Sequence, residues 1–135
     1  MKIRIHNYTW IGDKVEIGDG TKIQAFAFIP NGVTIGKNVF IGPHVCFTND
    51  KHPQAQGEWE QLETIVEDEV SIGANSTILP GITIGSHAKI GGGSVVTKNV
   101  PPGETWCGNP AKKMFKCPRG FKKCIECGGR DRYTF

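Results

Sequence analysis

The chain has 135 residues, which is enough for one domain. Charged residues make up 21% of the sequence and hydrophobic residues 38%, as is typical of a soluble globular protein rather than a disordered one. No apolar run approaches the roughly 20 residues that a membrane-spanning helix needs. We expect no signal peptide, because the polar start at Met1–Arg4 leads directly into the first repeat.

The net charge of +3 is distributed unevenly. Residues 1–111 contain eight Lys/Arg and eleven Asp/Glu, whereas residues 112–135 contain eight Lys/Arg and two Asp/Glu. We therefore expect one mildly acidic domain at 1–111, including a loop at 48–65, and a basic tail at 112–135. A basic tail is typical of a segment that contacts phosphate groups or of one that is merely solvated. We do not expect nucleic acid to be its partner.

An aliphatic residue recurs at every sixth position from the N-terminus onward. The series consists of Ile5, Ile11, Ile17, Ile23, Ile29, Ile35, Ile41 and Phe47, and it resumes with Val66, Ile72, Ile78, Ile84, Ile90 and Val96. A period of six matches neither an α-helix nor a simple alternating strand. It predicts a short strand and a corner, repeated, with three sides closing one coil. Glycine, which often follows the aliphatic residue, is expected to let the chain turn.

The repeated run I-G-x-x-V-x resembles the hexapeptide repeat of left-handed parallel β-helix acyltransferases over roughly residues 3–114. The segments 78–85 and 90–103 are similar to the closing coils of the acetyltransferase branch, and 108–113 to its exit sequence. The resemblance implies an all-β, left-handed parallel β-helix with one looped-out segment. It also implies acetyl-CoA as co-substrate, a homotrimer with parallel axes, and a cytoplasmic role in surface polysaccharide synthesis.

Three aromatic residues, Phe26, Phe28 and Phe40, lie outside the inward-facing register of the repeat. We therefore predict that their side chains point outward. Such a row indicates either a subunit interface, which the trimers of the family favour, or extra cover from a corner or loop.

The six-residue period breaks between Phe47 and Val66, where about thirteen residues are looped out. Long loops on rigid scaffolds usually carry function. This loop contains His52 before Pro53, several carboxylates, and Trp59 near its tip. An imidazole with an ordinary pKa of about 6.5 accepts a proton near neutral pH, as a general base must. Sugar O-acetyltransferases of the family carry a His-Pro here in that role, which implies that His52 is catalytic; the alternative is a solvated loop histidine.

Asn49 is the second candidate in the loop. The run Phe47-Thr48-Asn49-Asp50 resembles the loop start in the branch that N-acetylates amino sugars linked to a nucleotide. The resemblance implies that Asn49 positions the acceptor. The predicted reaction is therefore transfer of an acetyl group to the amino group of a nucleotide-linked amino sugar, and the alternative is O-acetylation of a sugar with His52 as the base.

A γ-type carbonic anhydrase on the same fold is a further, less favoured alternative. It needs three histidines that converge on zinc across a subunit interface, and His44, His52 and His87 are available. The closely spaced histidine pair of that class is missing. His44 and His87 occupy the same position within their repeats, where they are either solvated or in contact with the acceptor.

Coenzyme A is expected to lie along the later coils. The positions that match the family are Ala74 and Gly92, which are small enough for the pantetheine arm to approach the backbone, with Lys98 and Lys112 toward the phosphates. An amide of Ala74 or Gly92 is also placed to stabilise an oxyanion. The alternative for each lysine is that it is solvated at a corner and binds no phosphate.

The tail departs from the family pattern. Its cysteines, Cys117, Cys124 and Cys127, include a Cys-x-x-Cys-Gly run of the kind that binds zinc. A closed site needs a fourth ligand, which Cys107 or a neighbouring subunit would supply. The alternatives are free thiols, as in a reducing cytosol, and a redox or cluster role.

Overall fold

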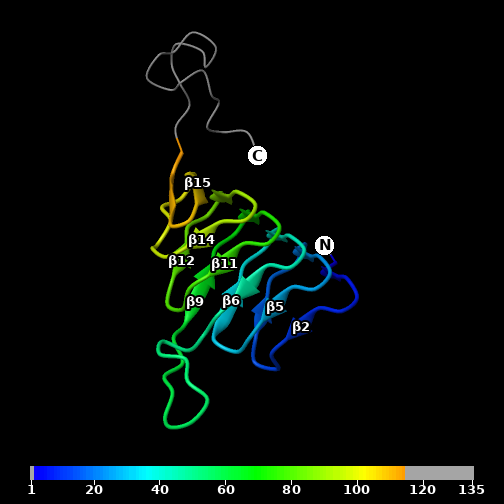
Figure 1. The fold of residues 1–135 in the computed structure, drawn as a ribbon. Helices are drawn as coiled ribbons and strands as arrows, with labels where there is room; N and C mark the ends of the chain where they lie inside the picture. The colour runs from blue at the N-terminus through cyan, green and yellow to red at the C-terminus, as the bar shows by residue number, and fades with distance from the viewer. Residues whose placement is uncertain (1, 115–135) are drawn as a thin grey trace.

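Each repeat contributes one short strand, and three successive strands complete one coil of a solenoid (Figure 1). The computed structural model describes residues 2–114, and these residues contain sixteen strands and no helix. The described part therefore has no helix of the length and apolarity that a membrane span needs.

The strands form three sheets, one on each side of the solenoid. The first sheet contains β1 (Arg4–Ile5), β4 (Lys22–Ile23), β7 (Phe40–Ile41), β10 (Ser71–Ile72), β13 (Lys89–Ile90), β15 (Thr105–Gly108) and β16 (Ala111–Lys113). The second contains β2 (Trp10–Ile11), β5 (Phe28–Ile29), β8 (Cys46–Phe47), β11 (Thr77–Ile78) and β14 (Val95–Val96). The third contains β3 (Glu16–Ile17), β6 (Val33–Ile35), β9 (Thr64–Val66) and β12 (Thr83–Ile84).

The pairing register places equivalent residues of successive repeats directly above one another. Ile5 pairs with Ile23, and Ile23 pairs with Ile41, in parallel. The register survives the interruption of the repeat, because Ile41 then pairs with Ile72. The predicted all-β, parallel β-helix is confirmed.

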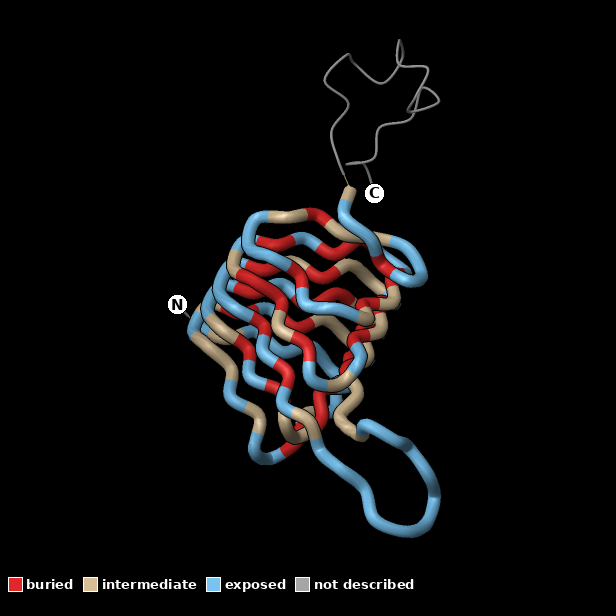
Figure 2. Tube along the Cα trace, turned by 90° about the vertical axis from the view of Figure 1, so that its left-hand side faces the viewer, coloured by how far each residue is buried: buried red, intermediate tan, exposed pale blue. Residues whose placement is uncertain are grey.

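The aliphatic residues of the repeat are buried, and buried segments recur on successive coils (Figure 2). Ile23, Ile41 and Ile72 are all 0% exposed, and full burial of such a side chain stabilises the fold by about 1.5–3 kcal/mol. Ile5, in the first coil, is 49% exposed because no earlier coil covers it. The other end is covered by β15 and β16, which pair antiparallel.

Buried hydroxyl groups tie neighbouring coils together at the corners. The Thr21 hydroxyl donates to the Gly36 carbonyl at 2.8 Å and accepts from the Val39 amide at 3.1 Å. The Ser76 hydroxyl donates to the Gly91 carbonyl of the next coil at 3.1 Å. A buried hydroxyl without a partner would destabilise the fold. These hydrogen bonds therefore explain how polar residues such as Thr21 and Ser76 can be buried in the repeat.

The glycine after the aliphatic residue does not have the role that we predicted for it. None of the glycines in this position, such as Gly73, has a positive φ. A Cβ on Gly73 would instead lie 2.5 Å from the amide nitrogen of Gly92 in the next coil. Positive φ values occur instead two positions after this one. Most of the residues there are not glycine, namely Tyr8, Phe26, Asn38, His44, Glu69, Asn75 and His87. Close approach of the coils, and not the turn, requires glycine here.

This difference predicts unequal effects of alanine at two neighbouring glycines. Gly73→Ala should lower the free energy of unfolding by about 1–3 kcal/mol, because the backbone of the next coil must move. Gly92→Ala should have little effect, since its Cβ would lie 3.4 Å from the nearest atom and its φ is ordinary. Urea unfolding of both variants tests this expectation, and equal losses would contradict it.

Candidate functional site

The segment that interrupts the repeat leaves the solenoid between β8 and β9 and stands away from its body (Figure 2). Its two arms pair antiparallel near the solenoid. The Lys51 amide donates to the Glu60 carbonyl at 3.0 Å, and the Leu62 amide donates to the Asn49 carbonyl at 2.9 Å. An exposed ion pair joins Lys51 Nζ to Glu60 Oε2 at 3.8 Å. This two-stranded stem gives the start of the loop a defined position.

The foot of the stem is fastened to the corner formed by Asn31 and Gly32. The Asn49 side-chain amide donates to the Asn31 carbonyl at 2.8 Å. The Thr64 amide donates to the Gly32 carbonyl at 2.8 Å, so both ends of the loop are held. Gly32 has φ +100°, and a Cβ on it would lie 2.9 Å from the Leu62 carbonyl oxygen. The structure thus gives Asn49 an anchoring contact that the sequence did not reveal.

His52 is the first residue beyond this stem. Its backbone amide donates to Asp50 Oδ1 at 3.0 Å, which turns the chain at this point. Its side chain is exposed, and the imidazole makes no hydrogen bond within residues 2–114. His52 is therefore open to solvent.

A cleft of about 390 Å³ lies between the stem and the second sheet. It is lined by Phe28, Phe47, Thr48, Asn49, Asp50, Lys51, Pro53, Leu79 and Pro80. His52 lies between two of the lining residues in the chain. Of the two predicted catalytic residues, Asn49 lines the cleft, whereas His52 itself does not. Sequence analysis missed Leu79 as part of the cleft, because the cleft joins residues from three successive coils.

Outward-facing aromatic side chains form two stacked ladders beside this cleft. The Trp10 and Phe28 rings stack along the second sheet with centroids 4.9 Å apart. Tyr8, Phe26 and His44 stack along the corner between the first and second sheets. Phe26, Phe28 and Phe40 are 53%, 41% and 38% exposed, which confirms that they point outward.

Of the four positions predicted to bind coenzyme A, the structure brings two together. Ala74 and Gly92 lie on successive coils, and the amide next to Gly92, that of Gly93, donates to the Ala74 carbonyl at 2.8 Å. They follow strands of the first sheet, whereas Lys98 follows β14 of the second and so lies at another corner. Lys112 belongs to β16, and it lines a hollow of about 460 Å³ at the C-terminal end together with Cys107.

The two corner histidines share a position in the repeat but not a corner of the solenoid. His44 follows β7 of the first sheet, whereas His87 follows β12 of the third. Within residues 2–114 of one chain, no three His, Cys, Asp or Glu side chains come together as metal ligands would. The predicted zinc ligands Cys117, Cys124 and Cys127 lie outside the described residues.

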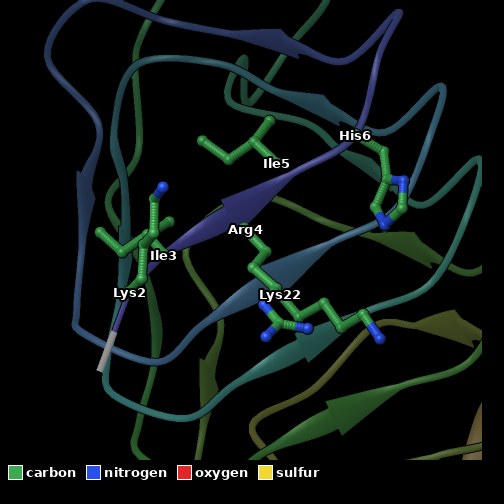
Figure 3. Close-up of a pocket in the computed structure, with 6 residues that line it drawn as sticks. All are labelled: Lys2, Ile3, Arg4, Ile5, His6 and Lys22. Atoms are coloured by element: carbon green, nitrogen blue, oxygen red, sulfur yellow. The ribbon is translucent and has the colours of Figure 1, made fainter.

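A further hollow, of about 600 Å³, lies at the open N-terminal end of the solenoid (Figure 3). It is lined by Lys2, Ile3, Arg4, Ile5, His6 and Lys22. None of the residues that we predicted to act in catalysis lines it, so the cleft beneath the loop remains the candidate site.

Comparison with known proteins agrees with this architecture. A family model described as bacterial transferase hexapeptide (six repeats) matches residues 14–49 and 63–98, on either side of the loop. Galactoside O-acetyltransferase of Escherichia coli is 39% identical over 59% of this chain and 42% of its own length. UDP-3-O-acylglucosamine N-acyltransferase of Methylorubrum extorquens is 33% identical over 85% of this chain and 30% of its own.

A solved structure extends the comparison to three dimensions. The crystal structure of a hexapeptide-repeat acetyltransferase of Vibrio cholerae in complex with acetyl coenzyme A has a TM-score of 0.77 and 30% identity. The match covers 84% of this chain and 67% of that one. The chain spans less than half the length of the two curated relatives above. Because the family model matches more than half of the sequence and the repeats build the same solenoid, the chain belongs to the bacterial transferase hexapeptide family.

Proposed function

We propose that this protein transfers an acetyl group from acetyl-CoA to a hydroxyl group of a sugar, with His52 as the general base. The observation that carries the proposal is the place of His52 directly after the paired stem, between Lys51 and Pro53, which both line the cleft. The resemblance to a galactoside O-acetyltransferase supports a sugar hydroxyl as acceptor. The complex of the Vibrio cholerae relative with acetyl coenzyme A supports the donor.

The proposed mechanism follows from the low reactivity of a sugar hydroxyl group. A sugar hydroxyl is a weak nucleophile until its proton is removed. His52 takes this proton as the hydroxyl oxygen forms a bond to the thioester carbonyl carbon. The carbon–sulfur bond then breaks, and the proton passes from the imidazole to the departing thiolate of coenzyme A. A backbone amide near Ala74 or Gly92 would stabilise the oxyanion between the two steps.

The donor is proposed to lie along the later coils. Ala74 and Gly92 leave the backbone accessible on two adjacent coils, as a pantetheine arm requires. Lys98 follows β14 of the second sheet, whereas Lys112 belongs to β16 at the end of the first sheet. We propose that each contacts phosphate groups of coenzyme A, either in one chain or across the homotrimer predicted for the family.

The second candidate function is N-acetylation of an amino sugar linked to a nucleotide, as in surface polysaccharide synthesis in the cytoplasm. Asn49 at the cleft favours it, as does the resemblance to an N-acyltransferase that acts on a UDP-linked sugar. An amine needs less help from a base than a hydroxyl does, so His52 would only assist. Nothing in residues 2–114 favours a γ-type carbonic anhydrase, and the cysteines of the predicted tail zinc site lie outside these residues.

The acceptor atom can be identified from the product. The protein is incubated with acetyl-CoA and either simple sugars or nucleotide-linked amino sugars, and the product is analysed by mass and by NMR. An ester on a simple sugar is the expected result. An acetamide on the amino sugar would replace the first proposal by the second, and no product in either pool would contradict both.

The role of His52 predicts a specific kinetic loss. His52→Ala should lower kcat by about 10²–10⁴, the usual contribution of a general base, with little change in KM for acetyl-CoA. Glu60→Ala is the matched control, since it removes the exposed ion pair with Lys51 from the arm of the stem that does not line the cleft. A loss of less than about tenfold in His52→Ala would disprove the base role.

Asn49 has a contact that can be separated from catalysis. Asn49→Ala should destabilise the protein by about 1 kcal/mol, because the Asn31 carbonyl loses its hydrogen bond. It should also speed amide hydrogen exchange at Leu62, whose amide bonds to the Asn49 carbonyl. Lost activity with unchanged stability and exchange would instead indicate that Asn49 acts on the acceptor alone.

A further inference from the structure

The aromatic ladder on the second sheet is incomplete. Trp10, Phe28 and Cys46 occupy equivalent positions on β2, β5 and β8 and are paired in register. Trp10 covers one face of the Phe28 ring at a centroid distance of 4.9 Å. The third place, on the other side of Phe28, is held by Cys46, whose side chain has no ring to stack.

The neighbouring ladder shows what a completed arrangement looks like. At the corner between the first and second sheets, Tyr8 stacks on Phe26, and His44 takes the third place with its ring 4.9 Å from that of Phe26. Both faces of Phe26 are therefore covered. In the described residues no second ring stacks on Phe28, so the two ladders differ at the third coil, where the loop begins.

The cleft beneath the loop adjoins Phe28 on the side of the later coils, because its other lining residues belong to or follow β8 and β11. Phe28 and Leu79 line this cleft as apolar groups, and Asn49, Asp50 and Lys51 line it as polar ones. Cys46 is half-buried, and burial raises the pKa of its thiol, so the third place is neutral as well as small. The cleft therefore combines one free aromatic face with hydrogen-bonding groups from the stem.

We propose that the pyranose ring of the acceptor occupies the third place of the ladder, stacked on Phe28 above Cys46. This inference rests on the proposed function and names the surface that selects a sugar for it. A pyranose has a face of C–H bonds that suits the negative face of an aromatic ring, and its hydroxyl groups point toward its edges, where the stem residues lie. The cleft volume of about 390 Å³ falls in the usual range for small-ligand sites.

The inference gives Phe28 a role different from the subunit contact that we predicted for it together with Phe26 and Phe40. Phe26 is covered on both faces, and Phe40 lies on the first sheet outside the cleft lining. Only Phe28, among these three, offers a ring face to the cleft. Phe40 therefore serves as a matched control for the removal of an exposed phenyl ring.

The test uses methyl β-D-galactopyranoside as the probe and two complementary variants. Phe28→Leu should raise KM for the galactoside by about threefold to tenfold, the effect of losing one aromatic contact. Cys46→Phe places a ring in the third position and should lower kcat/KM for the galactoside by about tenfold or more. KM for acetyl-CoA should stay unchanged in both. Phe40→Leu is the control and should match the wild type.

Saturation-transfer NMR provides a readout that does not depend on turnover. Saturation of the aromatic protons of the wild type should reach the C–H protons of the galactoside, and this transfer should be lost in Phe28→Leu and Cys46→Phe. If both variants keep the wild-type activity, KM and saturation transfer, the stacking of the sugar on Phe28 is disproved and the proposed function stands. If saturation transfer is lost in the variants but the wild type does not acetylate the galactoside, the stacking on Phe28 is supported and the proposed function is disproved. Absence of saturation transfer in the wild type would also disprove the stacking on Phe28.

Discussion

Every feature of the molecule depends on coils that stack at the distance of one hydrogen-bonded strand pair, about 4.8 Å. At this spacing the aliphatic side chains of equivalent repeats touch, and the column excludes water. The same spacing leaves no room for a side chain at Gly73, and it sets aromatic rings on the outside at stacking distance. One geometric constraint thus governs the core, the choice of glycine and the outer surface.

Much of the fold could be predicted from the sequence, because the six-residue period of isoleucine is visible without knowledge of any contact. The break after Phe47 located the loop for the same reason. The role of the glycines was predicted wrongly, because a one-dimensional pattern does not reveal which backbone atoms approach from the next coil. The period also does not assign a corner, so His44 and His87 looked equivalent although they belong to different corners.

The candidate site could be predicted only in part. His52 and Asn49 were visible as polar residues of an interrupting loop. Their anchoring was not, since Asn31 lies in the coil before and looks like an ordinary corner residue. The open face of Phe28 depends on the residue one full coil later in the register, Cys46. Such neighbours become apparent only when the coil is closed, because they are 18 residues apart in the chain.

The loop joins β8 to β9 without disturbing the register on either side. Val33, Thr34 and Ile35 pair with Thr64, Ile65 and Val66 as if nothing lay between the coils. The closure entropy of a loop rises only slowly with its length, so a longer or shorter segment would change the stability of the solenoid little. The insertion is therefore an exchangeable module. Replacement of this one segment would change the polar wall that the stem gives to the cleft, while Phe28 and Leu79 of the solenoid remain the same.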